Sequence, residues 1–476
     1  MIDLFNPDYA KNLVQWVHNQ GERISVNTAL FNIYEKRIGK LLEKKMIDDL
    51  GEKSFLQAKE RKAPINIARR VLDKLSKIYQ QEPRRQVIGG KESDSRLVEK
   101  FEQLLNIDHK LNINNELLNL YLNSLLQIGI DEGKPFVRNI SNHKFLIKNE
   151  SQVNPSSPDV YILFMDSIVD SMGVELEIYW IYTDYNFAIY DGNGAIRYDL
   201  MSELGQDGLN YYGVAPFMYQ NMSDNLCMPT IQDDTLDITL LIPLLLSDVN
   251  YIAKFTAYSI MYGVDVDASK LSMSPNVFWN FKSDSESDKK PEIGTVKPEG
   301  DIDSLISSTM SQLSMWLNTK GLKGSTIGSV DASNVASGIA KIIDEADVTD
   351  IRQYQASLYS VYETRFWDIL LNNIYPLWKE QGLIDDYGTF TVGAKVVVSF
   401  QEPTPVINRG EQVRVLKDEL DAGFTTKRRA IMLLNPEMTD KEVDQLIAEI
   451  EADKDAMTEK YLIASEGDKD EEQDGN

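Results

Sequence analysis

The feature that most constrains this chain is a very long helical segment, expected from about Ser333 to Lys379. Apolar residues recur there at steps of three and four, the spacing of one helix face. They are Ile339, Ile342, Ile343, Ala346, Ile351, Tyr354, Leu358, Val361, Ile369 and Ile374. At about 1.5 Å per residue the helix would span on the order of 65–70 Å, which exceeds the size of a small domain. Pro376 is expected to kink it near its end.

Two further helices and a flexible loop precede this segment. The first helix is expected from Leu236 to Tyr262 and the second from Asp301, a good N-cap, to Asn318. Val264 to Gly300 lies between them and is expected to hold two short strands, Val277 to Phe281 and Ile293 to Lys297. The loop that follows the second helix, Thr319 to Asp331, is rich in glycine and serine.

The chain before these helices indicates an α+β unit. Helices are expected at Ile65 to Tyr79, with Ile67, Val71, Leu75 and Ile78 on one face, and at Asn112 to Ile128. After Gly133 the pattern becomes typical of strands. These are expected at Phe136–Ile147, Val160–Met165, Glu175–Tyr182, Tyr185–Tyr190 and Val214–Tyr219, with a hairpin turn at Asp191–Gly194.

The end of the chain is expected to form one strand and short helices. The strand covers Phe390 to Phe400, and the helices cover Glu411–Leu420, Thr426–Leu434 and Thr439–Ala452. Residues 465–476 are acidic and lack a core-forming pattern, so we expect a disordered tail.

Composition excludes several classes of function. Acidic residues outnumber basic ones 74 to 49, giving a net charge of −25, which argues against a protein that coats nucleic acid. The single cysteine, Cys227, excludes an internal disulfide and favours folding in a reducing compartment. The first residues lack a signal-peptide pattern, and the longest apolar stretch, Ile238 to Leu246, is shorter than the about 20 residues a bilayer requires. We therefore expect no membrane association.

The search for catalytic motifs finds none with the right context. Gly321 to Thr326 has the residue types of a phosphate-binding loop in the wrong order, and Gly192-Asn193-Gly194 lies in a hairpin. Asp265 and Asp267 lack the closing glutamate of a calcium loop. The three histidines, His18, His109 and His143, lie beside no nucleophile motif. We expect no enzyme activity, no metal and no cofactor.

A group of basic residues could form a nucleic-acid patch. Its members are Arg61, Lys62, Arg69, Arg70, Lys74, Lys77, Arg84 and Arg85. A solvated helix face, or ion pairs with the carboxylates of this acidic chain, explains them better.

Taken in order, four segments resemble the portal protein of tailed bacteriophages, the head-to-tail connector ring. Ala63 to Asp73 is similar to an early wing helix, and Tyr211 to Phe217 to a glycine–proline strand. Val335 to Lys341 resembles the start of the long helix after the tunnel loop. The run Val396 to Pro405, followed by Glu411-Gln412-Val413 and Ala422 to Thr426, resembles the passage into the crown.

The resemblance implies a portal-type fold: an α/β wing, a two-helix stem, a small β-containing clip, a long helix after a tunnel loop, and a helical crown. The implied boundaries are wing 1–235, stem helices 236–263 and 301–318, clip 264–300, tunnel loop 319–333, long helix with returning wing strands 334–406, and crown 407–464. Pro243 in the first stem helix departs from the family pattern.

The resemblance also implies a function without catalysis. The family forms a ring, twelve-fold in phage, at one capsid vertex of the virion, and it is assembled in the host cytoplasm. DNA is packaged and later ejected through the ring, which contacts the major capsid and scaffold proteins, the terminase large subunit and then the tail adaptor.

Particular residues acquire roles by the same resemblance. Those of the tunnel loop that would touch double-stranded DNA are Lys320, Lys323, Ser325 and Thr326, with Gly321, Gly324 and Gly328 as hinges. The implied clip contacts to terminase or adaptor are Phe278, Trp279 and Phe281. Two alternatives stay open, a phage structural adaptor or scaffold with long helices and an enzyme of unidentified class.

Overall fold

The computed structural model describes residues 2–80, 82–150, 158–169, 172–223, 227–257, 260–264, 292–296, 302–322, 349–400, 409–435 and 443–450. The chain divides into two compact units, Met1–Gln401 and Glu402–Asn476, which we call unit 1 and unit 2. Helices and several antiparallel sheets together confirm the α+β class.

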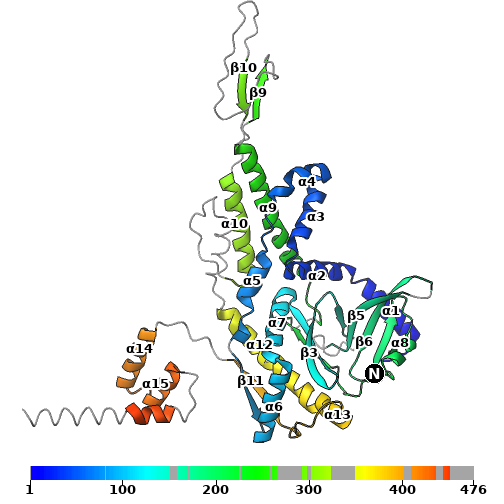
Figure 1. Cartoon of the computed structure of the whole chain (residues 1–476), viewed down its shortest axis with the longest axis vertical. Helices are drawn as coiled ribbons and strands as arrows, with labels where there is room; N and C mark the ends of the chain where they lie inside the picture. Colours follow the sequence, from blue (N-terminus) through cyan, green and yellow to red (C-terminus); the bar gives the residue numbers. More distant parts are fainter. Residues whose placement is uncertain are drawn as a thin grey trace, which may run out of the picture. The chain divides into compact units, whose positions relative to one another are not determined.

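Unit 1 begins with helices (Figure 1). They are α1 (Pro7–His18), α2 (Gly21–Tyr34), α3 (Ile38–Leu50), α4 (Glu52–Ala58) and α5 (Ile67–Leu75), followed by α6 (Glu92–Leu105) and α7 (Ile107–Tyr121). Asn6 caps α1 and Asn66 caps α5 by accepting backbone N–H groups of the first turn. The face of α5 is only partly as predicted, because the helix ends at Leu75 and Ile78 lies in the short 3-10 helix η2 (Ile78–Gln80).

Two antiparallel sheets follow. One has the order β3-β2-β8, built from β3 (Lys134–Ile140), β2 (Asn123–Asp131) and β8 (Phe217–Asn221). The other has the order β4-β5-β6-β7, built from β4 (Phe145–Lys148), β5 (Val160–Val169), β6 (Glu175–Tyr182) and β7 (Phe187–Asp191). The short helix α8 (Tyr198–Glu203) comes after the turn at Asp191–Gly194. That turn is confirmed, and Gly194 is required there because an added Cβ would lie 2.8 Å from the Cα of Lys11.

Several predicted boundaries are wrong. The helix expected to reach Ile128 ends at Tyr121, where Leu122 has a φ of +61° and the chain turns into β2. The strand expected over Phe136–Ile147 is two strands, since the turn at 141–144 separates β3 from β4. The strand expected over Phe390–Phe400 is only β11 (Lys395–Ser399), and it pairs with the unpredicted strand β1 (Arg84–Ile88).

The helix pair consists of α9 (Asp233–Ala257) and α10 (Ile302–Thr319). Pro243 lies inside α9 without ending it, and the hydroxyl of Ser247 donates to the Pro243 carbonyl at 2.6 Å. The helix was expected to continue to Tyr262, but Ile260–Val264 is strand β9, which pairs with β10 (Glu292–Val296). The strand expected at Ile293–Lys297 is thus confirmed, while that at Val277–Phe281 lies outside the described residues.

The described part of the long helix begins at α12 (Thr349–Asp368), and 333–348 lie outside the described residues. It continues through one π-helical segment, Ile369–Ile374, into α13 (Tyr375–Glu380). Pro376 lies at the start of α13, where a missing N–H costs least. Pro376 therefore lies in the first turn of α13, just after a π-helical segment, and not in the interior of a regular α-helix.

Unit 2 contains α14 (Arg409–Asp421), α15 (Lys427–Leu434) and a helical stretch at 443–450. Thr426 caps α15, since its side chain accepts the N–H of Arg429. The expected helices at Glu411–Leu420 and Thr426–Leu434 are confirmed. The expected tail lies outside the described residues.

Candidate functional site

Apolar residues hold the two helices α9 and α10 together. Ile242, Leu246 and Val249 of α9 pack with four residues of α10 that are all buried: Ile306, Met310, Leu313 and Leu317. The spacing of three and four residues places each set on one helix face. Burying side chains of this size contributes on the order of 1.5–3 kcal/mol each. The pair also packs on Ile67 and Val71 of α5, which ties it to the rest of unit 1.

Lys320 fastens the end of α10 to the start of α9. Its Nζ lies 2.9 Å from Oδ2 of Asp234 and 2.7 Å from Oε1 of Gln232, and 6.0 Å from the centre of the Trp316 ring. Since this contact joins the last turn of one helix to the first turn of the other, the two helices are antiparallel. Gly321 follows with a φ of +75°, and Leu322 is buried.

The buried face of α12 carries a column of polar side chains. Gln355, Tyr359 and Glu363, spaced four residues apart, are all 0% exposed. Gln355 accepts from Nδ2 of Asn115 at 3.0 Å and donates to Oδ1 of Asn119 at 2.6 Å. The Tyr359 hydroxyl donates to Oδ1 of Asn114 at 3.2 Å, so both residues bind α7.

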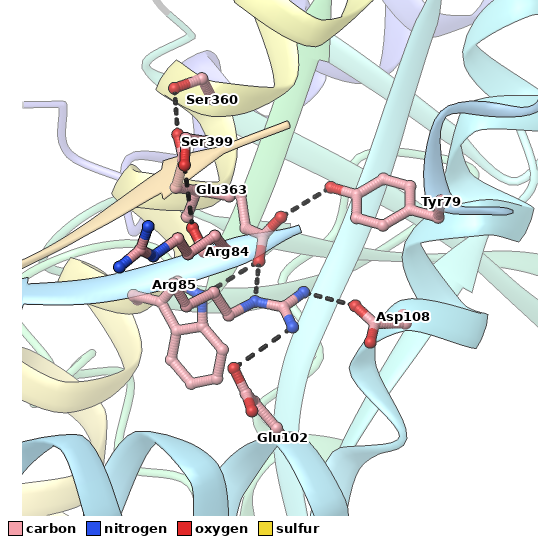
Figure 2. Close-up of polar contacts among 10 residues, drawn as sticks. Tyr79, Arg84, Arg85, Glu102, Asp108, Ser360, Glu363 and Ser399 are labelled. Atoms are coloured by element: carbon pink, nitrogen blue, oxygen red, sulfur yellow. Dashed lines mark hydrogen bonds and ion pairs between the residues drawn. The ribbon is translucent and has the colours of Figure 1, made fainter. Parts of the chain in front are cut away.

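Glu363 ends this column in a buried charge network (Figure 2). Its carboxylate accepts from Nε of Arg85 at 2.5 Å, from the Tyr79 hydroxyl at 2.7 Å, and from the indole N–H of Trp367 at 3.2 Å. The Arg85 guanidinium also contacts Asp108 at 2.5 Å and Glu102 at 3.2 Å. Carboxylates of α6, α7 and α12 therefore meet at one arginine of β1, whose side chain is 5% exposed.

Electrostatics follow from this burial. Burial alone would lower the pKa of Arg85, but Glu363 and Asp108 outweigh it and hold the pKa above its ordinary value. Burial also raises the pKa of Glu363, although Arg85 and two neutral donors oppose that rise. Arginine remains charged in such settings, so the network is a fixed structural anchor.

Three basic residues of the sequence pattern form ion pairs within the chain. Lys62 contacts Glu43, Arg69 contacts Asp73 at 3.0 Å and Glu116 at 3.1 Å, and Arg85 belongs to the network above. The interpretation as internal ion pairs is confirmed for these three residues.

The structure describes only two of the site residues that the resemblance implies. Lys320 and Gly321 lie at the end of α10, as described above. The remaining candidates lie outside the described residues: Lys323, Ser325, Thr326, Gly324, Gly328, Phe278, Trp279 and Phe281.

Sequence reasoning missed the buried column of α12. The expected apolar stripe included Tyr354 and Val361, but these are 49% and 67% exposed. One signal was available: Gln355 and Glu363 flank Tyr359 at four-residue spacing, which is a helix face in its own right.

Among the described residues, no group of three or more His, Cys, Asp or Glu could hold a metal ion. His143 packs against Phe31 at 4.4 Å, and burial lowers its pKa, whereas His18 lies 3.6 Å from Glu177 at the surface. Burial raises the pKa of Cys227 to about 12, which makes its thiol a poor nucleophile.

One described helix, over Asp233–Ala253 of α9, is long and apolar enough to cross a membrane by length and composition alone. The apolar stretch Ile238–Leu246, on which the expectation of no membrane association rested, is only part of this helix. Core helices also meet this criterion, and α9 packs against α10 and α5.

No family model matches the chain, and no curated protein matches it. Among solved structures it is similar to a chain from the neck of an empty GTA particle computed with C6 symmetry, with 8% identity, a TM-score of 0.38, and coverage of 80% of this chain and 92% of that one. A chain from the virion of a native gene transfer agent (GTA) particle has 8% identity and a TM-score of 0.36, covering 81% and 94%. A chain from the neck of a native GTA particle computed with C12 symmetry has 8% identity and a TM-score of 0.37, covering 80% and 92%.

Proposed function

We propose that this chain is the subunit of a portal ring in a phage-like particle, a conduit without enzyme activity. Its wing would be 1–235, its stem α9 and α10, its clip the region that contains β9 and β10, and its crown 407–464. Major capsid and scaffold proteins, the terminase large subunit and a tail adaptor would be its partners at one capsid vertex.

One observation carries this proposal. Within unit 1, α9 is followed by the antiparallel ladder of β9 with β10 and then by α10, which packs antiparallel on α9. It then reaches α12, which is bound to the α/β body by buried polar contacts. This order supports our assignment of these elements to the stem, clip and long helix that the sequence resemblance implies.

The charge of the chain suits a channel. Twelve copies would carry about −300 formal charges, from −25 each. A negative wall repels phosphates and keeps DNA mobile, while a few loop groups could touch it briefly. We assign that contact to Lys320, Lys323, Ser325 and Thr326, and the contact to terminase and adaptor to Phe278, Trp279 and Phe281.

The first test is the assembly state of the purified chain. A ring of twelve subunits of 54.1 kDa would have a mass of about 650 kDa and a central hole in electron micrographs. A monomer, or a compact particle without a hole, would contradict the proposal.

The second test separates the two roles open to Lys320. We expect Lys323→Ala, and Lys320→Ala with it, to leave the ring assembled and impair DNA packaging or retention. Asp234→Asn is the matched control, because it removes the ion pair of Lys320 but keeps the cation. Normal packaging in the double lysine variant would contradict the proposed DNA contact. An equal defect in Asp234→Asn would show that Lys320 acts only through its ion pair with Asp234.

A further inference from the structure

The tip of the β5–β6 hairpin exposes apolar side chains. Val169, Met172 and Val174 are 69%, 86% and 53% exposed, on a turn where Gly173 has a φ of +80°. Two acidic residues flank them. Asp166 is fully exposed, although 3.5 Å from Lys144, and Glu175 accepts from the Ser167 hydroxyl. The described residues of this tip therefore form an apolar knob with acidic side chains beside it.

An apolar hollow that could receive such a side chain lies between α12 and the segment that leads into β11. It has a volume of about 170 Å³, and its floor includes Trp367, Phe390 and Val396, all buried. An engineered apolar cavity of about 150 Å³ admits a benzene molecule, so this hollow can admit one apolar side chain. Val361 at its edge is 67% exposed, and Val392 in the adjoining loop is 97% exposed.

The rim of this hollow is basic. Arg365 and Lys395 line it and are exposed, while the one acidic lining residue, Asp368, accepts a hydrogen bond from Asn372 at 2.7 Å. The charge of the rim is thus opposite to that of the hairpin tip. Charge complementarity of this kind selects partners and fixes their orientation.

The two surfaces lie on different sides of unit 1. Figure 1 shows β5 and β6 on one side and β11 with α12 on the other. A closed ring needs this arrangement, because a face of one subunit must meet a different face of the next.

We propose that the β5–β6 tip of one copy docks in the α12–β11 hollow of the next copy, with Met172 as the knob. The inference rests on the proposed ring, and it names the contact that joins adjacent subunits. A second hollow, about 400 Å³ in volume beside α1 and α2, fits less well. It is bordered by Glu177 and formed partly by β5 and β6 themselves.

Cysteine cross-linking tests the contact directly. In a Cys227→Ala background, Met172→Cys combined with Val361→Cys should give a ladder of disulfide-linked oligomers on oxidation. The matched control pairs Met172→Cys with Met315→Cys, because Met315 on α10 is 66% exposed, almost the same as Val361. We expect no ladder from that pair or from either single variant.

A charge swap provides the second measurement. Arg365→Glu should lower the rate of cross-linking at least about tenfold by placing like charges together, and Asp166→Arg in the same chain should restore it. Rings in electron micrographs without a ladder would overturn this contact and leave the proposed function intact. A ladder without rings would support the contact and contradict the portal proposal, and the absence of both would overturn the two together.

Discussion

Two regions of the molecule hold a helix in place by different kinds of contact: the helix pair α9/α10, and the contacts of α12 with α7 and β1. The pair is held by apolar side chains with one partly exposed ion pair at its end. The described part of α12 also has apolar contacts, but it adds the buried polar contacts of Gln355, Tyr359 and Glu363 with α7 and β1. Apolar contacts are nondirectional, so they tolerate small shifts of one helix along another. Buried polar contacts fix one register, because a shifted helix would leave donors and acceptors unpaired.

This difference matters for a proposed conduit. Under that proposal, α9 and α10 would shift slightly against each other as the ring meets its partners, while α12 would keep a fixed position on α7 and β1. The comparison also predicts how each region responds to substitution.

The largest effect should come from Glu363→Ala. The change leaves Nε of Arg85, the Tyr79 hydroxyl and the Trp367 indole without their acceptor in a buried site. We expect a loss of about 3–5 kcal/mol in the free energy of unfolding, measured by urea denaturation. Glu102→Ala is the matched control, since Glu102 contacts the same arginine but its side chain is 27% exposed. Equal losses in the two variants would show that burial of Glu363 is unimportant.

The stability of the helix pair should depend on the volume of its buried side chains and little on their shape. Leu313 is fully buried at the centre of the α9/α10 contact, and Leu313→Ala should cost about 2–4 kcal/mol by leaving a cavity. Leu313→Met keeps the volume and should cost less than about 1.5 kcal/mol. A large loss in the methionine variant, measured by the same denaturation, would show that the pair is as specifically packed as the polar column.

The sequence predicts the helix pair α9/α10 better than it predicts the buried contacts of Glu363. Apolar periodicity predicts α9 and α10 to within a few residues, because an apolar face is visible in one segment alone. The anchor depends on partners far away in the chain: Glu363 meets Arg85 across 278 positions. Strand β1 was missed for the same reason, since Arg84–Ile88 becomes a strand only by pairing with β11. Local pattern also misassigned Tyr354 and Val361, which have the right spacing but face outward.

The smallest expected effect on stability concerns a carboxylate in the helix pair. Unlike the two substitutions above, its removal should raise the free energy of unfolding. Asp248 of α9 is exposed at the surface, but partial loss of its solvation, together with the nearby charge of Asp49, raises its pKa. The native state therefore binds this proton more tightly than the unfolded chain. The contribution of the protonated Asp248 carboxyl to stability is complete below the ordinary pKa of about 3.9. It is lost as the pH rises through the raised pKa of the folded protein.

Asp248→Asn removes the charge and should make the protein slightly more stable at pH 7. The gain should vanish near pH 3, where the native carboxyl is already neutral, and urea denaturation at both pH values measures it. Asp237→Asn on the same helix is the control. A loss of stability at pH 7 in Asp248→Asn would mean that the carboxylate is stabilised by its surroundings, and the helix pair would then also contain a polar contact that fixes its register.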